Sequence, residues 1–489
     1  MSVPVPDTRV VVVGGGVAGL VVAAECCRPG FSVTLLEAGA QTGGSVAPVE
    51  CAGLLLDAGA ESFATRGGHV QSLIEECGLG DDIVTPNPAG AWVRAGRRSF
   101  PLPKAGLLGI PSSPLAHDVV TAIGWRAALR AYGDRLMPVL TIGSEKRLGA
   151  LVRKRMGSAV LDRLVAPVVS GIYSANPDDL DLDVIAPGLN AALTRTGSLS
   201  GAVGQLRGPS KAGSAVLGIR GGMWRLPVAL SAHIIEQCGQ IDTGARVTTL
   251  ESWPDDPDEI TSPRWSVRVD DGRVVPADVV VCALPDREAL AFLAGSDPSL
   301  AALSALDWPE SSSVDLVTLV VSQPDLTTNP RGTGVLVSDT GDSGVVAKAL
   351  THSSAKWSWV AQYAGEGRQI IRLSYGRAGR VPETRGMSER DRCALVVRDA
   401  SALLGTPIDE SAVLDIVRTS WTNALPFAAR GQRERIDHVR SSVAAIPGLE
   451  VTGSWLAGTG LASVVPDARR VAKAVRGLRW KSLIEETKG

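Results

Sequence analysis

The chain has 489 residues, of which 45% are hydrophobic and 20% charged, and its formal net charge at pH 7 is −2. This length allows about two or three packed units, and the balanced charge argues against a nucleic-acid partner. Seven cysteines without a CxxC pair and five histidines without an HExxH pattern support neither a disulfide framework nor a metal site. Met1–Thr8 is short and polar, and no apolar run reaches the length of a bilayer span. We therefore expect a cytoplasmic protein.

The segment from Arg9 to Gly44 carries a dinucleotide-binding pattern. A β-branched run, Val10–Val13, predicts a buried parallel strand, and the uncharged segment that follows the glycines predicts a helix. Glycines in GxGxxG spacing separate the two. The first allows a tight turn, the second lets backbone approach a pyrophosphate, and the third lets the helix pack on the strand. A second predicted strand ends at Glu37, which is placed to accept hydrogen bonds from a ribose.

A second glycine pair favours FAD over NAD as the dinucleotide. Gly43 and Gly44 let the chain cross beside the pyrophosphate with no side chain in the way. The alternative interpretation of the uncharged helix is a membrane span, but the run is too short, contains glycine and meets Glu25. From this segment we expect the following residues at the cofactor: Gly14, Gly15, Gly16, Val17, Ala18, Gly19, Glu37, Ala38, Gly43 and Gly44.

Later segments return to the cofactor. The small residues of GAESF, 59–63, would let the chain pass close to a flavin, where Glu61 either caps a helix or contacts the ring. Near the C-terminus, a glycine-rich turn leads into a helix whose first turn contains Pro466. The partial positive charge at the start of that helix would favour reduced flavin. Two single positions, Val247 and Trp421, are also expected at the cofactor. The segments add to the residues expected there Gly59, Ala60, Glu61, Ser62, Gly453, Gly458, Gly460, Leu461, Ser463 and Val464.

The middle of the chain predicts a helical insertion and a second sheet. Apolar residues recur at helical spacing within 115–217, which is either a packed insertion or a membrane-contacting domain. Single strands are expected over 241–250 and 274–281, and a helix beyond Asp409. The predicted fold class is α/β, with a Rossmann-like FAD-binding domain built from non-contiguous segments and an antiparallel-sheet substrate domain. We expect the FAD-binding domain to comprise 1–85, 218–290 and 440–480, and the substrate-binding domain 86–114 and 291–439.

Together these motifs resemble those of the FAD-dependent porphyrinogen oxidases. This family is a branch of the superfamily that includes monoamine oxidases and carotenoid desaturases. The resemblance spans nearly the whole chain, although Ser45 stands where many superfamily members have a basic residue. It is carried by GAESF at 59–63, LDRLVAPVVSGIYSANPDDL at 161–180, RGGMWRLPVAL at 220–230 and VTGSWLAGTGLASVVPDA at 451–468.

The resemblance implies a six-electron oxidation of a porphyrinogen in heme biosynthesis, in three rounds. Noncovalent FAD would take a hydride in each round, and molecular oxygen would reoxidise it to give hydrogen peroxide. Coproporphyrinogen III is favoured over protoporphyrinogen IX. An amine oxidase or desaturase of the same fold, or a non-catalytic porphyrin carrier, stays an alternative. No general base is identifiable. Peripheral membrane contact and transfer of product to the next heme-pathway enzyme are further expectations. The residues expected at the substrate are Lys104, Gly171, Tyr173, Arg220, Gly221 and Gly222.

Overall fold

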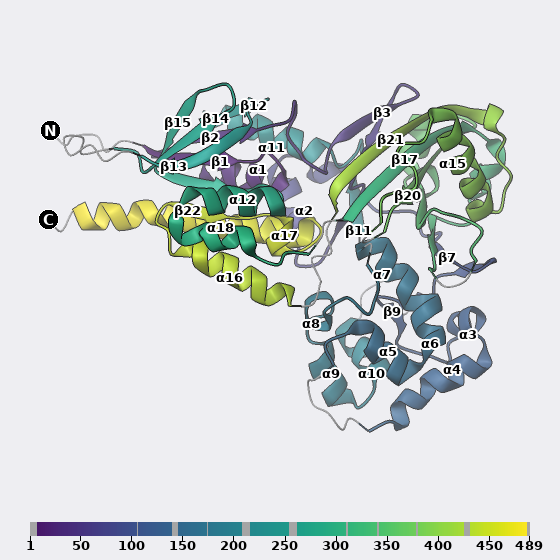
Figure 1. Ribbon diagram of the computed structural model, residues 1–489. Coiled ribbons are helices and arrows are strands. Elements are labelled where there is room, and N and C mark those ends of the chain that lie inside the picture. The colour runs from purple at the N-terminus through teal and green to yellow at the C-terminus, as the bar shows by residue number, and fades with distance from the viewer. Residues whose placement is uncertain are drawn as a thin grey trace.

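The computed structural model describes three groups of elements, which Figure 1 shows as a parallel-sheet layer, a broad second sheet and a bundle of short helices. The described residues are 7–104, 106–138, 145–173, 175–207, 216–253, 262–309, 312–339, 342–377, 380–424 and 431–486.

The first group is built on a five-stranded parallel sheet. Its strands come from three distant parts of the chain and lie in the order β12-β2-β1-β16-β22. The valines of Val10–Val13 are buried at its centre, since β1 pairs with a neighbour on both edges. The non-contiguous Rossmann-like arrangement expected from the sequence is therefore confirmed. The strands are β1 (Thr8–Val13), β2 (Phe31–Glu37), β12 (Gln240–Thr243), β16 (Val279–Cys282) and β22 (Leu449–Val451).

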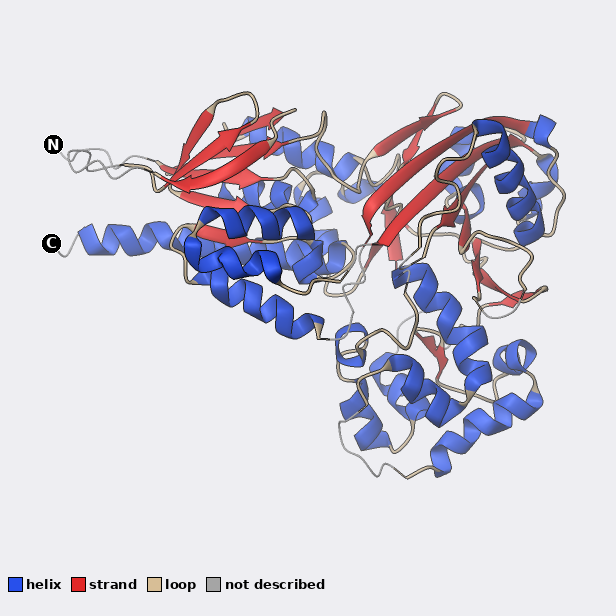
Figure 2. Ribbon diagram, in the orientation of Figure 1, coloured by secondary structure: helices blue, strands red, loops and turns tan. Residues whose placement is uncertain are grey.

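Helices cover both faces of this sheet (Figure 2). The glycine-loop helix α1 packs on α11 and on the long C-terminal helix α18. The helices of this group are α1 (Val17–Cys26), α2 (His69–Glu76), α11 (Arg225–Glu236), α12 (Asp286–Ser296), α16 (Gln432–Ala444), α17 (Ser454–Ala457) and α18 (Leu461–Glu486).

Two stretches expected as single strands are each divided between two sheets. Gly244, at φ +68°, turns the chain after β12, so the rest of the first stretch pairs antiparallel in another sheet as β13. In the second stretch Asp278 separates β15 from β16, and its carboxylate accepts a hydrogen bond from the Arg9 guanidinium at 2.8 Å. The expectation of single strands was wrong because a polar or glycine residue breaks each run. The additional three-stranded sheet contains β13 (Val247–Ser252), β14 (Trp265–Val269) and β15 (Val274–Ala277).

The second group is a seven-stranded sheet, antiparallel except for the parallel pair β18-β7. The helix expected beyond Asp409 is instead its edge strand β21, so that prediction was wrong. The β-branched and aromatic residues of β21 lie along β17 over most of its length. Helix α15 (Glu389–Leu404) covers one face of the sheet. In sheet order the strands are β21 (Val413–Ala424), β17 (Ser312–Ser322), β20 (Arg368–Tyr375), β19 (Ala349–His352), β18 (Gly334–Val337), β7 (Ala91–Ala95) and β8 (Arg98–Pro101).

The third group is a bundle of short helices with its own apolar core. It joins the second sheet through α7, since a Cβ added at Gly171 would lie 2.7 Å from Leu336 Cδ2 on β18. Its helices are α3 (His117–Ile123), α4 (Trp125–Tyr132), η2 (Gly133–Leu136), α5 (Leu148–Met156), α6 (Ser158–Val160), η3 (Leu161–Val165), α7 (Ala166–Tyr173), α8 (Leu182–Ile185), α9 (Leu189–Thr196) and α10 (Leu199–Arg207).

Short elements connect these groups. The remaining strands are β3 (Pro48–Cys51), β4 (Leu54–Asp57), β5 (Phe63–Ala64), β6 (Ile83–Val84), β9 (Gly106–Leu107), β10 (Ile110–Pro111) and β11 (Val216–Ile219). The remaining helical turns are η1 (Gly80–Asp82), η4 (Pro298–Ala305), η5 (Pro324–Thr328), α13 (Ser353–Lys356), α14 (Ser358–Ala364) and η6 (Glu410–Ala412).

Candidate cofactor and substrate site

The glycine loop between β1 and α1 leaves an open space at its second glycine. Gly14 has φ +108°, and a Cβ there would lie 2.7 Å from the Ala283 carbonyl oxygen. A Cβ at Gly19 would lie 1.9 Å from the Gly14 carbonyl oxygen, which excludes any side chain. A Cβ at Gly16, in contrast, would meet no described atom within 4 Å beyond its chain neighbours. The loop is therefore tightly packed at Gly14 and Gly19 and open at Gly16. This leaves the space that a pyrophosphate requires next to the backbone.

Glu37 holds this loop from the end of β2. Its carboxylate accepts hydrogen bonds from the backbone N–H of Gly15 at 2.7 Å and of Gly39 at 2.6 Å. A carboxylate has about four acceptor positions, so two stay free for ribose hydroxyls. The Ala245 N–H donates to the Glu37 carbonyl at 2.9 Å, and this contact brings the start of β13, with Val247, to the same edge of the sheet.

The second glycine pair lies against the first. The Gly43 N–H donates to the Gly15 carbonyl at 2.8 Å. Gly44 also lies close to Gly16, since a Cβ added at Gly44 would lie 3.4 Å from the Gly16 Cα. Gly43 has φ +114°, and a Cβ there would lie 3.1 Å from Pro227 Cγ in the first turn of α11. The two glycine segments and the start of α11 thus surround one space.

A turn at Asp57–Glu61, named the interdomain turn below, continues this arrangement. The Ala60 N–H donates to the Ser45 carbonyl at 3.3 Å, and a Cβ at Gly59 would lie 2.1 Å from the same oxygen. From the other side, the Trp421 indole donates to the Ala58 carbonyl at 3.2 Å. Three groups of predicted cofactor residues, at 43–44, 59–60 and 421, are therefore brought together.

Asp57 joins this turn to the start of α11. Its carboxylate accepts from the backbone N–H groups of Met223 and Trp224, each at 3.1 Å, and burial raises its pKa to about 6. The Trp224 indole N–H is buried and, among the described residues, has no hydrogen-bond partner. A buried donor costs free energy unless it is paired. An orphaned donor beside an open glycine cradle fits a bound group that offers oxygen acceptors, as a dinucleotide does.

Glu61 forms a buried ion cluster with the second sheet. Its Oε1 lies 2.6 Å from Lys356 Nζ, and its Oε2 lies 3.2 Å from an Arg372 guanidinium nitrogen. Burial alone would raise the pKa of Glu61, but the two cations outweigh it and lower that pKa to about 2. Both carboxylate oxygens are thus engaged by side chains, and a direct contact between Glu61 and flavin stays a prediction.

The C-terminal segment returns to the parallel sheet through β22 and packs α18 against α1, the helix that follows the glycine loop. β22 is followed by three glycines with positive φ, Gly453, Gly458 and Gly460, and α18 begins at Leu461. Pro466 was expected in the first turn of this helix, but it lies inside α18. That prediction was wrong because the helix begins directly after Gly460. At its start, the Ser463 hydroxyl accepts a hydrogen bond from Arg66 at 3.1 Å.

Arg66 also links this helix start to the helical bundle. Burial raises the pKa of the Tyr173 hydroxyl at the end of α7, and the nearby positive charge of Arg66 opposes this rise. Arg66 was missed from the sequence, since a single arginine after GAESF carries no motif. Tyr173, predicted at the substrate, thus lies within the electrostatic influence of the arginine that contacts the start of α18.

Lys104 and Arg220, the two cations predicted at the substrate, form their backbone hydrogen bonds with α3 and η1. The Lys104 N–H donates to Asp118 at 3.1 Å, and the Lys104 side chain is exposed. The Arg220 N–H donates to the Asp82 carbonyl at 2.7 Å, and its own carbonyl accepts from Arg225 at 2.6 Å. The Arg220 side chain is exposed and precedes Gly221 and Gly222, which both have positive φ. A role for these residues at the substrate stays a prediction.

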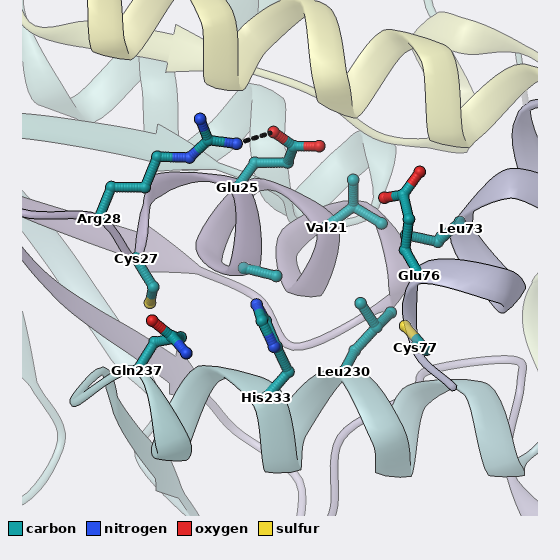
Figure 3. A pocket seen from close by; sticks show the side chains of 11 residues that line it. Val21, Glu25, Cys27, Arg28, Leu73, Glu76, Cys77, Leu230, His233 and Gln237 are labelled. Atoms are coloured by element: carbon teal, nitrogen blue, oxygen red, sulfur yellow. Dashed lines mark hydrogen bonds and ion pairs between the residues drawn. The ribbon is translucent and has the colours of Figure 1, made fainter. Parts of the chain in front are cut away.

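A surface cavity of about 340 Å³ lies behind this site, between α1, α2 and α11. Figure 3 shows its polar rim, which includes Glu25, Arg28 and His233. It is lined by the C-terminal half of α1, whereas a dinucleotide binds at the N-terminal end of the helix that follows the glycine loop. This cavity is therefore separate from the cofactor site.

The parallel sheet, its glycine cradle and the acidic end of β2 define the class of protein: a dinucleotide-binding protein with a Rossmann-like fold. The described part of the chain contains no group of three or more histidine, cysteine, aspartate or glutamate side chains that could hold a metal ion. Across the same described ranges, no helix is both long and apolar enough to cross a membrane.

Comparison with known proteins identifies the family. The chain belongs to the flavin containing amine oxidoreductases, whose family model matches residues 17–476. It is 29% identical to a coproporphyrinogen III oxidase of Mycobacterium tuberculosis, covering 95% of this chain and 96% of the relative. It is 26% identical to the chloroplastic protoporphyrinogen oxidase of Nicotiana tabacum, covering 97% and 86%. A solved structure from Exiguobacterium sp. 255-15, named provisionally as a protoporphyrinogen oxidase, has a TM-score of 0.81 and 25% identity, covering 96% and 98%.

Proposed function

We propose that this chain is an FAD-dependent coproporphyrinogen III oxidase of heme biosynthesis, which uses oxygen and releases hydrogen peroxide. The observation that carries this proposal is its similarity, over 95% of its length, to relatives named coproporphyrinogen III oxidase. That length includes the helical bundle, in which Tyr173 ends α7 within reach of the positive charge of Arg66.

Bound noncovalently, FAD would supply the hydride acceptor for each two-electron round. The glycine segments would hold its pyrophosphate, and Glu37 would bind the ribose of the adenosine. The N-terminus of α18 would stabilise negative charge on reduced flavin, since a helix start carries a partial positive charge. Arg372 and Trp421 hold the backbone of the interdomain turn. We assign no general base.

The preference for coproporphyrinogen III rests on charge. Its four carboxylates require more cationic or N–H partners than the two of protoporphyrinogen IX. Arg66 is an exposed cation at the start of α18 and supplies one such partner, and we expect the exposed Lys104 and Arg220 to supply others. The tobacco relative, named protoporphyrinogen oxidase, makes protoporphyrinogen IX the second candidate substrate.

Oxygen consumption by the purified protein, offered each porphyrinogen in turn, tests this function. We expect a higher kcat/KM for coproporphyrinogen III than for protoporphyrinogen IX, with hydrogen peroxide formed in both cases. We also expect Arg220→Ala to penalise the four-carboxylate substrate more, by about 1–3 kcal/mol for a lost charged hydrogen bond. A preference for protoporphyrinogen IX would overturn the substrate assignment, and activity with amines alone would overturn the whole proposal.

We also propose that the helical bundle contacts a membrane surface. Trp125, Leu129 and Leu136, on α4 and η2, are 65%, 58% and 85% exposed. The spacing of four and seven residues supports one stripe, in which Tyr132 also lies. Exposed arginines at 126, 130 and 135 flank it, whereas Asp134 in the same stretch is buried against Arg155. An apolar stripe with a basic border fits an anionic lipid surface.

A further inference from the structure

The interdomain turn presents three consecutive carbonyls to the seven-stranded sheet. One guanidinium nitrogen of Arg372, on β20, donates to the Asp57 carbonyl at 3.2 Å and to the Gly59 carbonyl at 2.7 Å. The Trp421 indole, on β21, donates to the Ala58 carbonyl between them at 3.2 Å. Two side chains of one sheet therefore fix the orientation of three successive peptide groups in the turn that follows β4.

The N–H groups of the same turn face the cofactor cradle. In a trans peptide the C=O and N–H point in opposite directions. Accordingly, the Ala58 N–H donates to the Ala47 carbonyl at 2.8 Å and the Ala60 N–H to the Ser45 carbonyl at 3.3 Å. Both acceptors follow the second glycine pair directly. The turn is thus held between the seven-stranded sheet and the segment that borders the pyrophosphate space.

A cluster of buried charges strengthens the contact between the interdomain turn and the seven-stranded sheet. The side chains of Glu61, Lys356 and Arg372 are 10%, 18% and 12% exposed, and Glu61 forms an ion pair with each cation. Buried charges keep a fixed geometry, because a displaced partner leaves an uncompensated charge in a poorly solvated place. Arg372 is the one side chain of this cluster that contacts both Glu61 and the carbonyls of the turn.

We propose that Arg372 is a positioning residue for the flavin, acting from the substrate sheet through the interdomain turn. By fixing the carbonyls of Asp57 and Gly59 and the carboxylate of Glu61, it sets where Gly59 and Ala60 stand at the edge of the cofactor space. This inference rests on the proposed function, since it requires that flavin occupies the cradle. It deepens that function by coupling the sheet that faces the substrate to the cofactor.

Two substitutions at Arg372 separate positioning from simple folding. Arg372→Lys keeps the charge but lacks the planar fork that holds the two carbonyls with one nitrogen and Glu61 with the other. Arg372→Gln removes the charge as well, and Glu61→Gln removes only the ion pair. The matched control is Arg418→Gln, since Arg418 lies on β21 of the same sheet and pairs with the buried Asp315 at 3.2 Å. Among the described residues, its side-chain hydrogen bond goes to Asp315 and not to the turn.

Flavin-free protein of each variant is titrated with FAD, and the visible circular dichroism of the bound flavin is recorded. We expect Arg372→Lys to weaken FAD binding by about tenfold, the loss of one charge-assisted hydrogen bond, and to shift the visible flavin bands. Arg418→Gln should leave both readouts unchanged, even if its melting temperature falls. Should Arg372→Gln fail to fold, Arg372→Lys and Glu61→Gln still supply both measurements.

Two results would overturn the inference. One is wild-type FAD affinity and flavin bands in Arg372→Lys. The other is an equal loss in Arg418→Gln, which would indicate a general effect of destabilising the sheet. A wild-type protein that binds no FAD would instead remove the proposed function, and this inference with it.

Discussion

The Glu37 carboxylate accepts hydrogen bonds from the glycine loop, and we expect the same carboxylate to bind ribose. Removing this side chain therefore has two effects. The contacts with Gly15 and Gly39 are lost together with the ribose contact. We predict that Glu37→Ala weakens FAD binding by about 1.5–3 kcal/mol, the loss of a charge-assisted hydrogen bond. Equilibrium titration of flavin-free protein measures this. Glu75→Ala is the control, since Glu75 is an exposed residue of α2 whose carboxylate accepts a hydrogen bond from Gln71. Equal affinity in the two variants would contradict the placement of Glu37.

The buried carboxyl group of Asp57 should make the stability of the folded protein depend on pH. Burial raises its pKa from 3.8 to about 6, so the folded protein binds this proton more tightly than the unfolded chain does. The associated stabilisation is full below pH 3.8 and is lost as pH rises through 6, a change of about 3 kcal/mol.

The test compares wild type with Asp57→Asn in thermal melts at several pH values between 4 and 7. The stability of wild type relative to Asp57→Asn should fall as pH rises through this window, since the amide does not titrate. Asp81→Asn, at an exposed position of η1, serves as the reference substitution. A difference between wild type and Asp57→Asn that is independent of pH would contradict the prediction.

At the scale of elements, local pattern predicted the strands and the helix that surround the candidate cofactor site. The valine run, the spacing of Gly14, Gly16 and Gly19, and the acidic end of β2 each depend on a few adjacent residues, and all formed as expected. Two of the failures concern strands whose sheet partners lie far away in the chain. β21 pairs with β17 along the edge of the sheet. This pairing decides the conformation of β21 more than the periodicity of its own residues does. The divided strands at 240–252 likewise depend on which sheet each half joins.

The exposed stripe on α4 and η2 gives an element-scale prediction about membranes. We expect the protein to sediment with phosphatidylglycerol vesicles at low salt and to be released as salt rises, because arginine–lipid attraction is screened. Replacing both Leu129 and Leu136 by serine should weaken this binding by at least about tenfold through lost apolar burial.

The control for this prediction is a second exposed apolar pair. Val228 and Ile235, on α11, are as open to solvent as Leu129 but lie on the cofactor-binding group of elements. Val228→Ser with Ile235→Ser should leave vesicle binding unchanged. Equal binding to vesicles of zwitterionic phosphatidylcholine, or an equal loss in both double variants, would count against an anionic lipid surface as the partner of the stripe.

Across the whole molecule, the site depends on contacts between residues that are far apart in the chain. Arg372 meets Gly59, and Trp421 meets Ala58, across more than 300 residues. No local pattern marks such pairs. Trp421 was predicted only as a single position, and Arg372 and Arg66 were missed. Lys104 and Arg220 were chosen for charge and for neighbouring motifs, and the structure places their backbones beside α3 and η1.

Because the proposed FAD site draws on residues 14–19, 37–61 and 453–464, its occupation should stabilise the whole fold. A ligand that binds only the folded state stabilises it by about 1.4 kcal/mol for each tenfold rise in free ligand above Kd. We predict that the melting temperature of flavin-free protein rises steadily with FAD, whereas NAD gives no rise. Gly16→Val should abolish the FAD effect, because its side chain would enter the space above the loop. The matched control is Gly295→Val, on α12, where an added Cβ also meets nothing within 4 Å. An FAD-dependent rise in Gly16→Val as large as that in Gly295→Val would show that the cofactor does not occupy this cradle.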